Sequence, residues 1–210
     1  MKSSSRVNSR RLRAEETFGT AQEALGTIEH GEHVFLITRG QFSMLDMIEV
    51  VIRQIGECNI SVWTWAIADY EVQAMDALAL NRKLLSARLI VDRSAERRSV
   101  ETIDMWRERF GSDSVRVCKN HAKIARIWNA EWSILIRGSM NLNFNPRFEQ
   151  ADITEGGEDF TLVQKIETEL PVLKRLCGNP EAVASSKLKL AFMNDDIPKW
   201  DDYEDTIPKW

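Results

Sequence analysis

The chain has 210 residues with a formal net charge of −4, and 43% of its residues are hydrophobic and 29% charged. This length supports one domain with a sizeable core, and the composition is that of an ordinary globular protein, which excludes disordered and collagen-like chains. No apolar run is long enough to span a bilayer, the basic N-terminus lacks the apolar stretch of a secretion signal, and the three scattered cysteines fit neither a disulfide framework nor a metal site, so we expect a cytoplasmic protein.

The first third of the chain predicts a tail, two helices and a strand. Residues 1–13 are polar and basic and are predicted to be disordered. A helical pattern covers 14–29, and an apolar run of strand length covers 33–38. Ser43 is placed to cap a helix that Gly56 ends. The apolar face predicted for that helix consists of Met44, Met47, Ile48, Val51, Ile52 and Ile55.

The rest of the domain alternates between the two periodicities. The pattern predicts, in order, a strand over 60–67, a helix over 69–82, a strand over 87–92, a helix over 100–110, strands over 115–118, 122–128, 132–137 and 149–153, and a helix over 160–176. Strands that alternate with helices predict an α/β fold with a largely parallel sheet, and the close pair 122–128 and 132–137 predicts an antiparallel hairpin in it. We therefore expect a mixed β-sheet flanked by helices, in a domain over 14–178.

Residues 179–210 are predicted to be a flexible acidic tail. They contain Ile-Pro-Lys-Trp twice, ending at Trp200 and at Trp210. Acidic residues followed by Ile-Pro and an aromatic residue resemble the C-terminal tip of bacterial single-stranded DNA-binding proteins, which implies a protein partner for this tail. The alternative is a solubilising tail without a partner.

The residues with the most chemical content run from His121 to Glu149. Residues two apart in a strand point to the same side, so His121 and Lys123 can address one phosphate together. The next strand ends in Gly138-Ser139-Met-Asn141, where backbone N–H groups, a hydroxyl and an amide can bind phosphate oxygens. Glu149 can accept a hydrogen bond from Nδ1 of His121, which would leave Nε2 free to react.

This order of residues resembles the signature of the phospholipase D superfamily, which is His-x-Lys, then Gly-Ser-x-Asn, then Asn and Glu. The matching residues are His121, Lys123, Gly138, Ser139, Asn141, Asn145 and Glu149. Over about residues 30–177 the chain also resembles small phage and prophage proteins that carry this domain. The stretches that suggest it are Gly40-Gln-Phe-Ser43, Thr64-Trp65, Val91-Asp92-Arg93-Ser94 and the run from Ser139 to Glu149. The resemblance implies a phospholipase D-like fold and a phosphodiesterase.

The resemblance also implies a mechanism. The catalytic residues would be His121, Lys123 and Glu149, with His121 attacking phosphorus to form a phosphohistidine. The phosphate would be held by Gly138, Ser139, Asn141 and Asn145. No metal or other cofactor is implied. A second histidine would protonate the leaving oxygen. Neither His30 nor His33 is followed by Lys two positions later, so we expect a homodimer with a composite site.

One position departs from the signature, because Trp128 stands where the superfamily usually has Asp. The alternative function is therefore a catalytically silent nucleic-acid- or protein-binding module on the same fold. A third reading is a strand histidine beside a solvated lysine, followed by a loop that only turns the chain.

The expected partner is nucleic acid, DNA rather than RNA, since no membrane-binding amphipathic helix is present. Arginines between residues 88 and 109 either follow its backbone or pair with nearby carboxylates. The tryptophans are expected mostly in the core or an interface, with base stacking left open for Trp63, Trp65, Trp106, Trp128 and Trp132.

Overall fold

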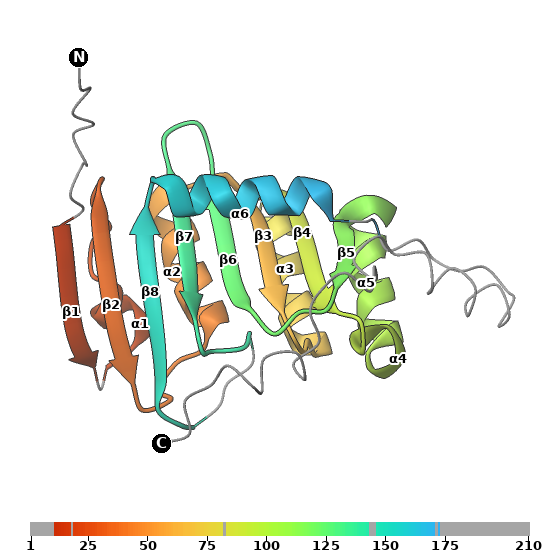
Figure 1. Ribbon diagram of the computed structural model, residues 1–210, viewed down its shortest axis with the longest axis horizontal. Helices are drawn as coiled ribbons and strands as arrows, with labels where there is room; N and C mark the ends of the chain where they lie inside the picture. Colours follow the sequence, from red (N-terminus) through yellow and green to blue (C-terminus); the bar gives the residue numbers. More distant parts are fainter. Residues whose placement is uncertain (1–10, 18, 82, 143–145, 171, 173–210) are drawn as a thin grey trace, which may run out of the picture. The chain divides into compact units, whose positions relative to one another are not determined.

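One mixed sheet organises the residues that the computed structural model describes, which are 11–17, 19–81, 83–142, 146–170 and 172. Its strands are β1 (Arg11–Thr17), β2 (Glu32–Thr38), β3 (Cys58–Thr64), β4 (Leu84–Asp92), β5 (Val115–Cys118), β6 (Lys123–Trp128), β7 (Ser133–Gly138) and β8 (Glu149–Glu155). Their order in the sheet is β1-β2-β8-β7-β6-β3-β4-β5 (Figure 1). The predicted tail over 179–210 lies outside the described residues.

Helices cover both faces of this sheet. They are α1 (Ala21–Leu25), α2 (Met44–Ile55), α3 (Asp69–Leu80), α4 (Ala95–Arg98), α5 (Val100–Phe110) and α6 (Glu158–Glu169). In Figure 1, α6 crosses in front of β7, β6, β3 and β4, whereas α2, α3 and α5 lie behind the sheet. The mixed β-sheet flanked by helices that the sequence predicts is therefore confirmed.

Helix α2 forms as its sequence predicts. The Ser43 hydroxyl accepts a hydrogen bond from the Asp46 backbone N–H at 3.3 Å, and the Asp46 carboxylate accepts one from the Ser43 N–H at 2.6 Å. This reciprocal capping satisfies two donors that a helix start leaves without partners. Five of the six predicted apolar residues are buried, and Ile55 is half-buried. Gly56 ends the helix at a φ of +80°, where a side chain would be strained.

Two expectations about the fold are wrong. Residues 14–29 are not one helix, because Ala14–Thr17 belong to strand β1 and only Ala21–Leu25 are helical. The second concerns residues 1–13, which were predicted to be a disordered tail. Strand β1 begins at Arg11, inside that stretch. It lies at the edge of the sheet, where polar side chains are tolerated and the usual alternation of a strand is lost. Arg13 secures it through its Nε, which lies 3.1 Å from a carboxylate oxygen of Glu32.

The sheet is also less parallel than predicted. Among the described strands, β1–β2, β3–β4 and β4–β5 pair in parallel. The pairs β2–β8, β3–β6, β6–β7 and β7–β8 are antiparallel. The predicted hairpin is correct, but β7 and β8 then continue the antiparallel block through the middle of the sheet, so hairpin-like connections rather than helical crossovers shape the edge that carries the site.

A buried carboxylate fixes α6 to the sheet. Glu167 has no exposed surface, and its Oε1 accepts hydrogen bonds from the Ser61 hydroxyl at 2.6 Å and from Trp63 Nε1 at 2.8 Å. Its Oε2 accepts two more from Arg126, at 3.0 and 2.6 Å. Arg126 is itself only 3% exposed. Because Ser61 and Trp63 lie on β3 and Arg126 lies on β6, this one side chain holds α6 across both strands.

Candidate functional site

The sheet register brings the predicted site residues to one edge. Lys123 opens β6 and pairs with Gly138, the last residue of β7. Gly138 in turn pairs with Ala151 of β8, and that strand begins at Glu149. His121 lies two residues before Lys123, in the segment that enters β6 at the lower edge of the sheet in Figure 1. Residues that are far apart in the chain thus meet across β6, β7 and β8.

His121 and Lys123 are in direct contact. Lys123 Nζ lies 3.1 Å from His121 Nδ1 and 3.4 Å from Nε2, and it donates a hydrogen bond to the His121 backbone carbonyl at 2.7 Å. His121 is exposed, whereas Lys123 is only 8% exposed. Because Nζ lies at similar distances from both ring nitrogens, it sits against the ring rather than along one lone pair, and these contacts do not select a tautomer.

Ser139 and Glu149 form the second part of the site. The Ser139 hydroxyl donates a hydrogen bond to Glu149 Oε2 and accepts one from the Gln150 backbone N–H at 3.0 Å. The Ser139 N–H also donates to the Gln150 carbonyl at 3.1 Å. This differs from the expected geometry, in which Glu149 accepts from His121 Nδ1. The hydrogen bond that the structure shows at this carboxylate comes from the serine hydroxyl.

Of the two asparagines in the signature, the structure describes Asn141. Asn141 is half-buried, and its Oδ1 is buried without a hydrogen-bond partner among the described residues. Buried polar atoms are nearly always hydrogen-bonded, so Asn141 Oδ1 is expected to accept a hydrogen bond from a ligand or from a further protein group. Asn145 lies outside the described residues.

Gly138 is required by its own strand neighbours. A Cβ at this position would lie 2.2 Å from the Gln150 carbonyl oxygen and 3.1 Å from Ala151 Cα, and both are backbone atoms that cannot rotate away. The sequence suggested that this glycine lets a ligand approach. The structure shows that it lets β8 approach β7, which places Glu149 beside Ser139.

The Gly138→Ala variant is therefore expected to be destabilised by about 1–3 kcal/mol, the usual cost of overpacking. Urea unfolding measures the loss, with Ser133→Ala at the other end of β7 as the control. Because the added methyl group pushes β8 away, activity should fall further than stability alone explains. If Gly138→Ala were as stable as the parent, β8 could move away from β7 without a loss of folding stability.

His121 is positioned by residues whose role the sequence does not predict. Asn120 is 4% exposed, and its backbone N–H donates to Asp92 Oδ2 at 3.0 Å. Its side chain donates to the Thr64 carbonyl at 3.2 Å and accepts from the Ala122 N–H at 2.8 Å. The residues on both sides of the candidate nucleophile are thus tied to the ends of β3 and β4.

The carboxylate in this network is ionised. Burial acts to raise the pKa of Asp92, but hydrogen bonds from Ser94, Asn120 and Arg93 outweigh it and hold the pKa below its usual value. The sequence offered one signal, since Asp92 and Ser94 lie in a stretch that carries the family resemblance. Their role was not readable because it depends on contacts across strands.

Aromatic and arginine side chains also flank the site. The Trp65 ring centroid lies 6.1 Å from that of His121, and the Arg98 guanidinium lies 4.3 Å from the Trp65 centroid. On the other side, Phe148 directly precedes Glu149, and the Arg39 guanidinium lies 5.2 Å from its ring centroid. Other arginines of the predicted basic stretch are paired, Arg107 with Asp104 and Arg109 with Asp76.

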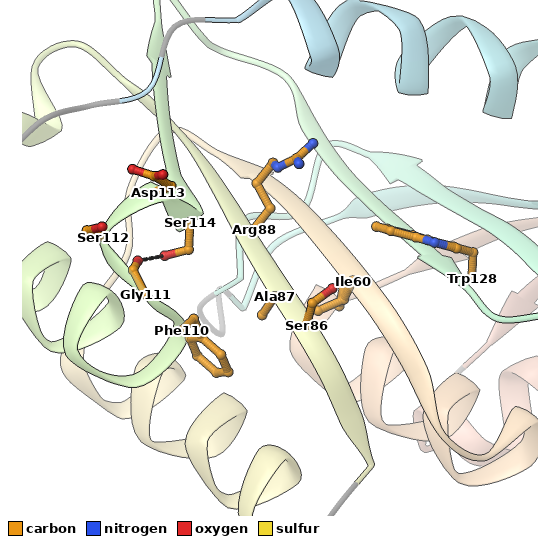
Figure 2. Close-up of a pocket in the computed structure, with 10 residues that line it drawn as sticks. All are labelled: Ile60, Ser86, Ala87, Arg88, Phe110, Gly111, Ser112, Asp113, Ser114 and Trp128. Carbon is orange, nitrogen blue, oxygen red and sulfur yellow. Dashed lines mark hydrogen bonds between the residues drawn. The ribbon is translucent and has the colours of Figure 1, made fainter.

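Trp128 lies at the opposite end of β6 from Lys123. They are five residue steps apart, roughly 17 Å at ~3.4 Å per step. Figure 2 shows Trp128 and Arg88 bordering a hollow of about 410 Å³, with Phe110 and the turn from Gly111 to Ser114 on its other side. The Arg126 guanidinium lies 3.8 Å from a Trp128 ring centroid. The residue that departs from the signature is therefore remote from His121.

The buried ammonium gives the site a pH dependence. Burial lowers the pKa of Lys123, and the opposing charge of Glu149 offsets this in part. A lowered lysine pKa means that the unfolded chain binds more protons, so folding stability rises with pH between the folded and unfolded pKa values. Function has the opposite sign, because loss of the proton removes the charge that would bind phosphate.

Phosphate-dependent activity should therefore decline on the alkaline side at a pH below the ordinary lysine pKa, and Lys123→Arg should move this decline to higher pH. A pH–rate profile of kcat/KM for both proteins checks this expectation. An alkaline limb that is the same in both would assign it to another group.

No group of three or more His, Cys, Asp or Glu side chains among the described residues is arranged to hold a metal ion. None of the described helices has the length and apolar character needed to cross a membrane.

Comparisons with known proteins add limited information. No protein-family model matches the sequence, and no curated protein matches it. Solved structures do match part of the chain. Polyphosphate kinase from Porphyromonas gingivalis matches with a TM-score of 0.48 and 15% identity, over 75% of this chain and 30% of the kinase chain. Phosphatidylserine synthase from Haemophilus influenzae Rd KW20 gives 0.44 and 17%, over 75% and 44%.

The archaeal chromatin protein TrmBL2, whose structure shows a mode of DNA binding, matches with a TM-score of 0.44 and 10% identity, over 69% of this chain and 52% of its own. The present chain thus spans about half or less of each of these proteins. Likenesses at this level leave the function to be argued from the geometry of the site.

Proposed function

We propose that this chain is a phosphodiesterase of the phospholipase D superfamily, and that it cleaves nucleic acid without a metal ion. One observation carries the proposal. The register of β6, β7 and β8 gathers a histidine, a buried lysine and a serine held by a glutamate at one edge, and these are residues whose order resembles the superfamily signature. The unpartnered Oδ1 of Asn141 is an acceptor and does not bind phosphate oxygens, so the proposal assigns the Nδ2–H donors of this amide to the phosphate.

In the proposed mechanism, His121 Nε2 attacks phosphorus while the bond from phosphorus to the leaving oxygen breaks. A second histidine donates its proton to that oxygen. Water then attacks the phosphohistidine, gives its proton to the second histidine, and releases His121. Lys123, the amide N–H of Asn141 and the Ser139 hydroxyl, once its proton turns from Glu149 to the phosphate, stabilise the charge that develops on the non-bridging oxygens. Gly138 permits the arrangement, and Asn145 is proposed to complete it.

The contact between His121 and Lys123 describes a resting state. Attack by Nε2 needs that nitrogen unprotonated and accessible, whereas the ammonium now lies 3.4 Å from it. A bound phosphate would attract the ammonium away from the ring, and Nδ1 could then hold the proton. Lys123 has three donors, so it can keep its hydrogen bond to the His121 carbonyl while it binds the substrate.

The second histidine is proposed to come from a second copy of the chain. The sequence has three histidines, and the other two lie at the far end of the sheet. His33 Nε2 lies 2.6 Å from Asp152, and His30 stacks on Trp132 with ring centroids 3.8 Å apart. Neither can reach His121, so a homodimer with a composite site supplies the missing acid. A monomer in light scattering that still cleaves substrate would remove this step.

A catalytically silent binding module is the second candidate. Trp128 in place of the usual Asp favours this candidate, although its position at the opposite end of β6 from Lys123 weakens that argument. Such a module would bind nucleic acid and leave it intact.

Incubation with single- and double-stranded DNA and RNA in excess EDTA separates the two candidates. The proposal predicts cleavage of at least one substrate, DNA before RNA. Salt-dependent binding without cleavage would support the silent module instead.

A further inference from the structure

Two exposed aromatic rings, each paired with an arginine, lie on either side of the candidate phosphate site. Trp65 follows β3 directly and is 38% exposed, with Arg98 over its ring. Phe148 precedes β8 directly and is 67% exposed, with Arg39 over its ring. Other large apolar side chains of this chain are as exposed, so exposure alone does not distinguish these two; the arginine over each ring and their place beside the site do.

The pairs stand at the same edge of the sheet as the site. From β8 to β3 the sheet passes β7 and β6, which carry Ser139 and Lys123 at this edge. Three strand spacings at ~4.8 Å separate β8 from β3, so the strand ends that carry the two rings lie roughly 14 Å apart along the edge. The phosphate site lies between them.

We propose that these two pairs are base-stacking subsites, and that the substrate is a single-stranded nucleic acid. This rests on the proposed function for the position of the scissile phosphate. Each ring offers a face to a base, and each guanidinium can stack on that base or bind the adjacent phosphate. The combination of basic and aromatic groups is the one that binds single strands without reading sequence.

The spacing is what excludes a duplex. Successive bases in a duplex strand are stacked at about 3.4 Å. Subsites carried by strand ends roughly 14 Å apart hold the two bases next to one phosphate only if those bases are splayed, and bases splay readily only in a single strand.

Binding of fluorescent single-stranded oligonucleotides, measured by anisotropy in the His121→Ala background, tests the inference without cleavage. Trp65→Ala and Phe148→Ala should each weaken binding about 5- to 150-fold, the fold-change that corresponds to the stacking of one base. Neither should weaken binding of an oligonucleotide of the same length that has abasic sites at the positions next to the bound phosphate. Trp65→Phe should restore most of the affinity.

Two control variants match these changes. Trp132→Ala removes a tryptophan that also contacts a histidine ring, but at the other end of the sheet, and should leave binding unchanged. Arg98→Ala and Arg39→Ala should each reduce the slope of log affinity against log salt by about 0.7, whereas Arg53→Ala, near the C-terminal end of α2, should not. Arg39 pairs with Glu16 as Arg53 pairs with Glu49, so these two variants differ in position and not in pairing.

The outcomes separate this inference from the proposed function. Equal losses for normal and abasic oligonucleotides, no loss at all, or tighter binding of duplex than of single strands would overturn the stacking subsites. Ring-dependent binding by a wild-type chain that cleaves nothing would retain the subsites and remove the nuclease. Cleavage by wild type together with unchanged binding in the ring variants would retain the nuclease and remove the stacking subsites.

Discussion

Replacement of His121 by alanine is expected to abolish hydrolysis. His121 is the one histidine at the edge where Lys123, Ser139 and Glu149 meet, and it is exposed to an incoming substrate. Loss of a nucleophile in enzymes that form covalent intermediates costs on the order of 10⁴- to 10⁶-fold in kcat. Initial rates of oligonucleotide cleavage in EDTA measure the effect.

His33→Ala is the matched control for that experiment. His33 is also a strand histidine beside a charged partner, with Asp152 at 2.6 Å, but it lies near the opposite end of β2. Its loss should leave the cleavage rate within a few-fold of wild type. If His33→Ala were inactive and His121→Ala active, the reacting centre would lie at the other end of the sheet.

Glu167→Ala is expected to give the largest loss of stability. The substitution leaves the guanidinium of Arg126, which is 3% exposed, without its carboxylate, and removes acceptors from Ser61 and Trp63. Breaking a buried ion pair by removing one partner typically costs about 3–5 kcal/mol. At about 2–4 °C per kcal/mol for a chain of this size, the Tm should fall by roughly 6–20 °C.

Two further variants show whether this loss has the stated cause. Glu169→Ala, two residues later on the exposed side of α6, should change Tm little. Replacing both partners, as Arg126→Met with Glu167→Leu, should recover much of the stability because no buried charge remains. A double variant that is less stable than Glu167→Ala alone would mean that Arg126 stabilises the fold through groups other than Glu167.

The sequence predicts most of the elements because their patterns are local. Ser43, the apolar face after it and Gly56 define α2 without reference to any other part of the chain. Strand β1 was missed for the opposite reason. It is a polar strand at the sheet edge, and only its pairing with β2 and the contact between Arg13 and Glu32 make it a strand. Pairing partners far along the chain leave no local pattern to read.

The site shows the same division. The order of His121, Lys123 and Ser139 in the sequence predicts a shared site, and the register of three strands places these residues at one edge. The partner of Glu149 could not be predicted, because the choice between Ser139 and His121 depends on how closely β8 approaches β7 at Gly138. The support of His121 by Asn120 and Asp92, and the rings of Trp65 and Phe148, depend in the same way on how the strand ends are arranged.

The most direct test of the account is capture of the covalent intermediate. Wild-type protein mixed with a cleavable oligonucleotide in EDTA, quenched under denaturing alkaline conditions within one turnover and digested, is analysed by peptide mass spectrometry. The account predicts a peptide that contains His121 and carries a phosphoryl-linked nucleotide fragment, absent from His121→Ala. Cleavage with no such adduct, or an adduct on a different residue, would contradict the proposal that His121 is the nucleophile.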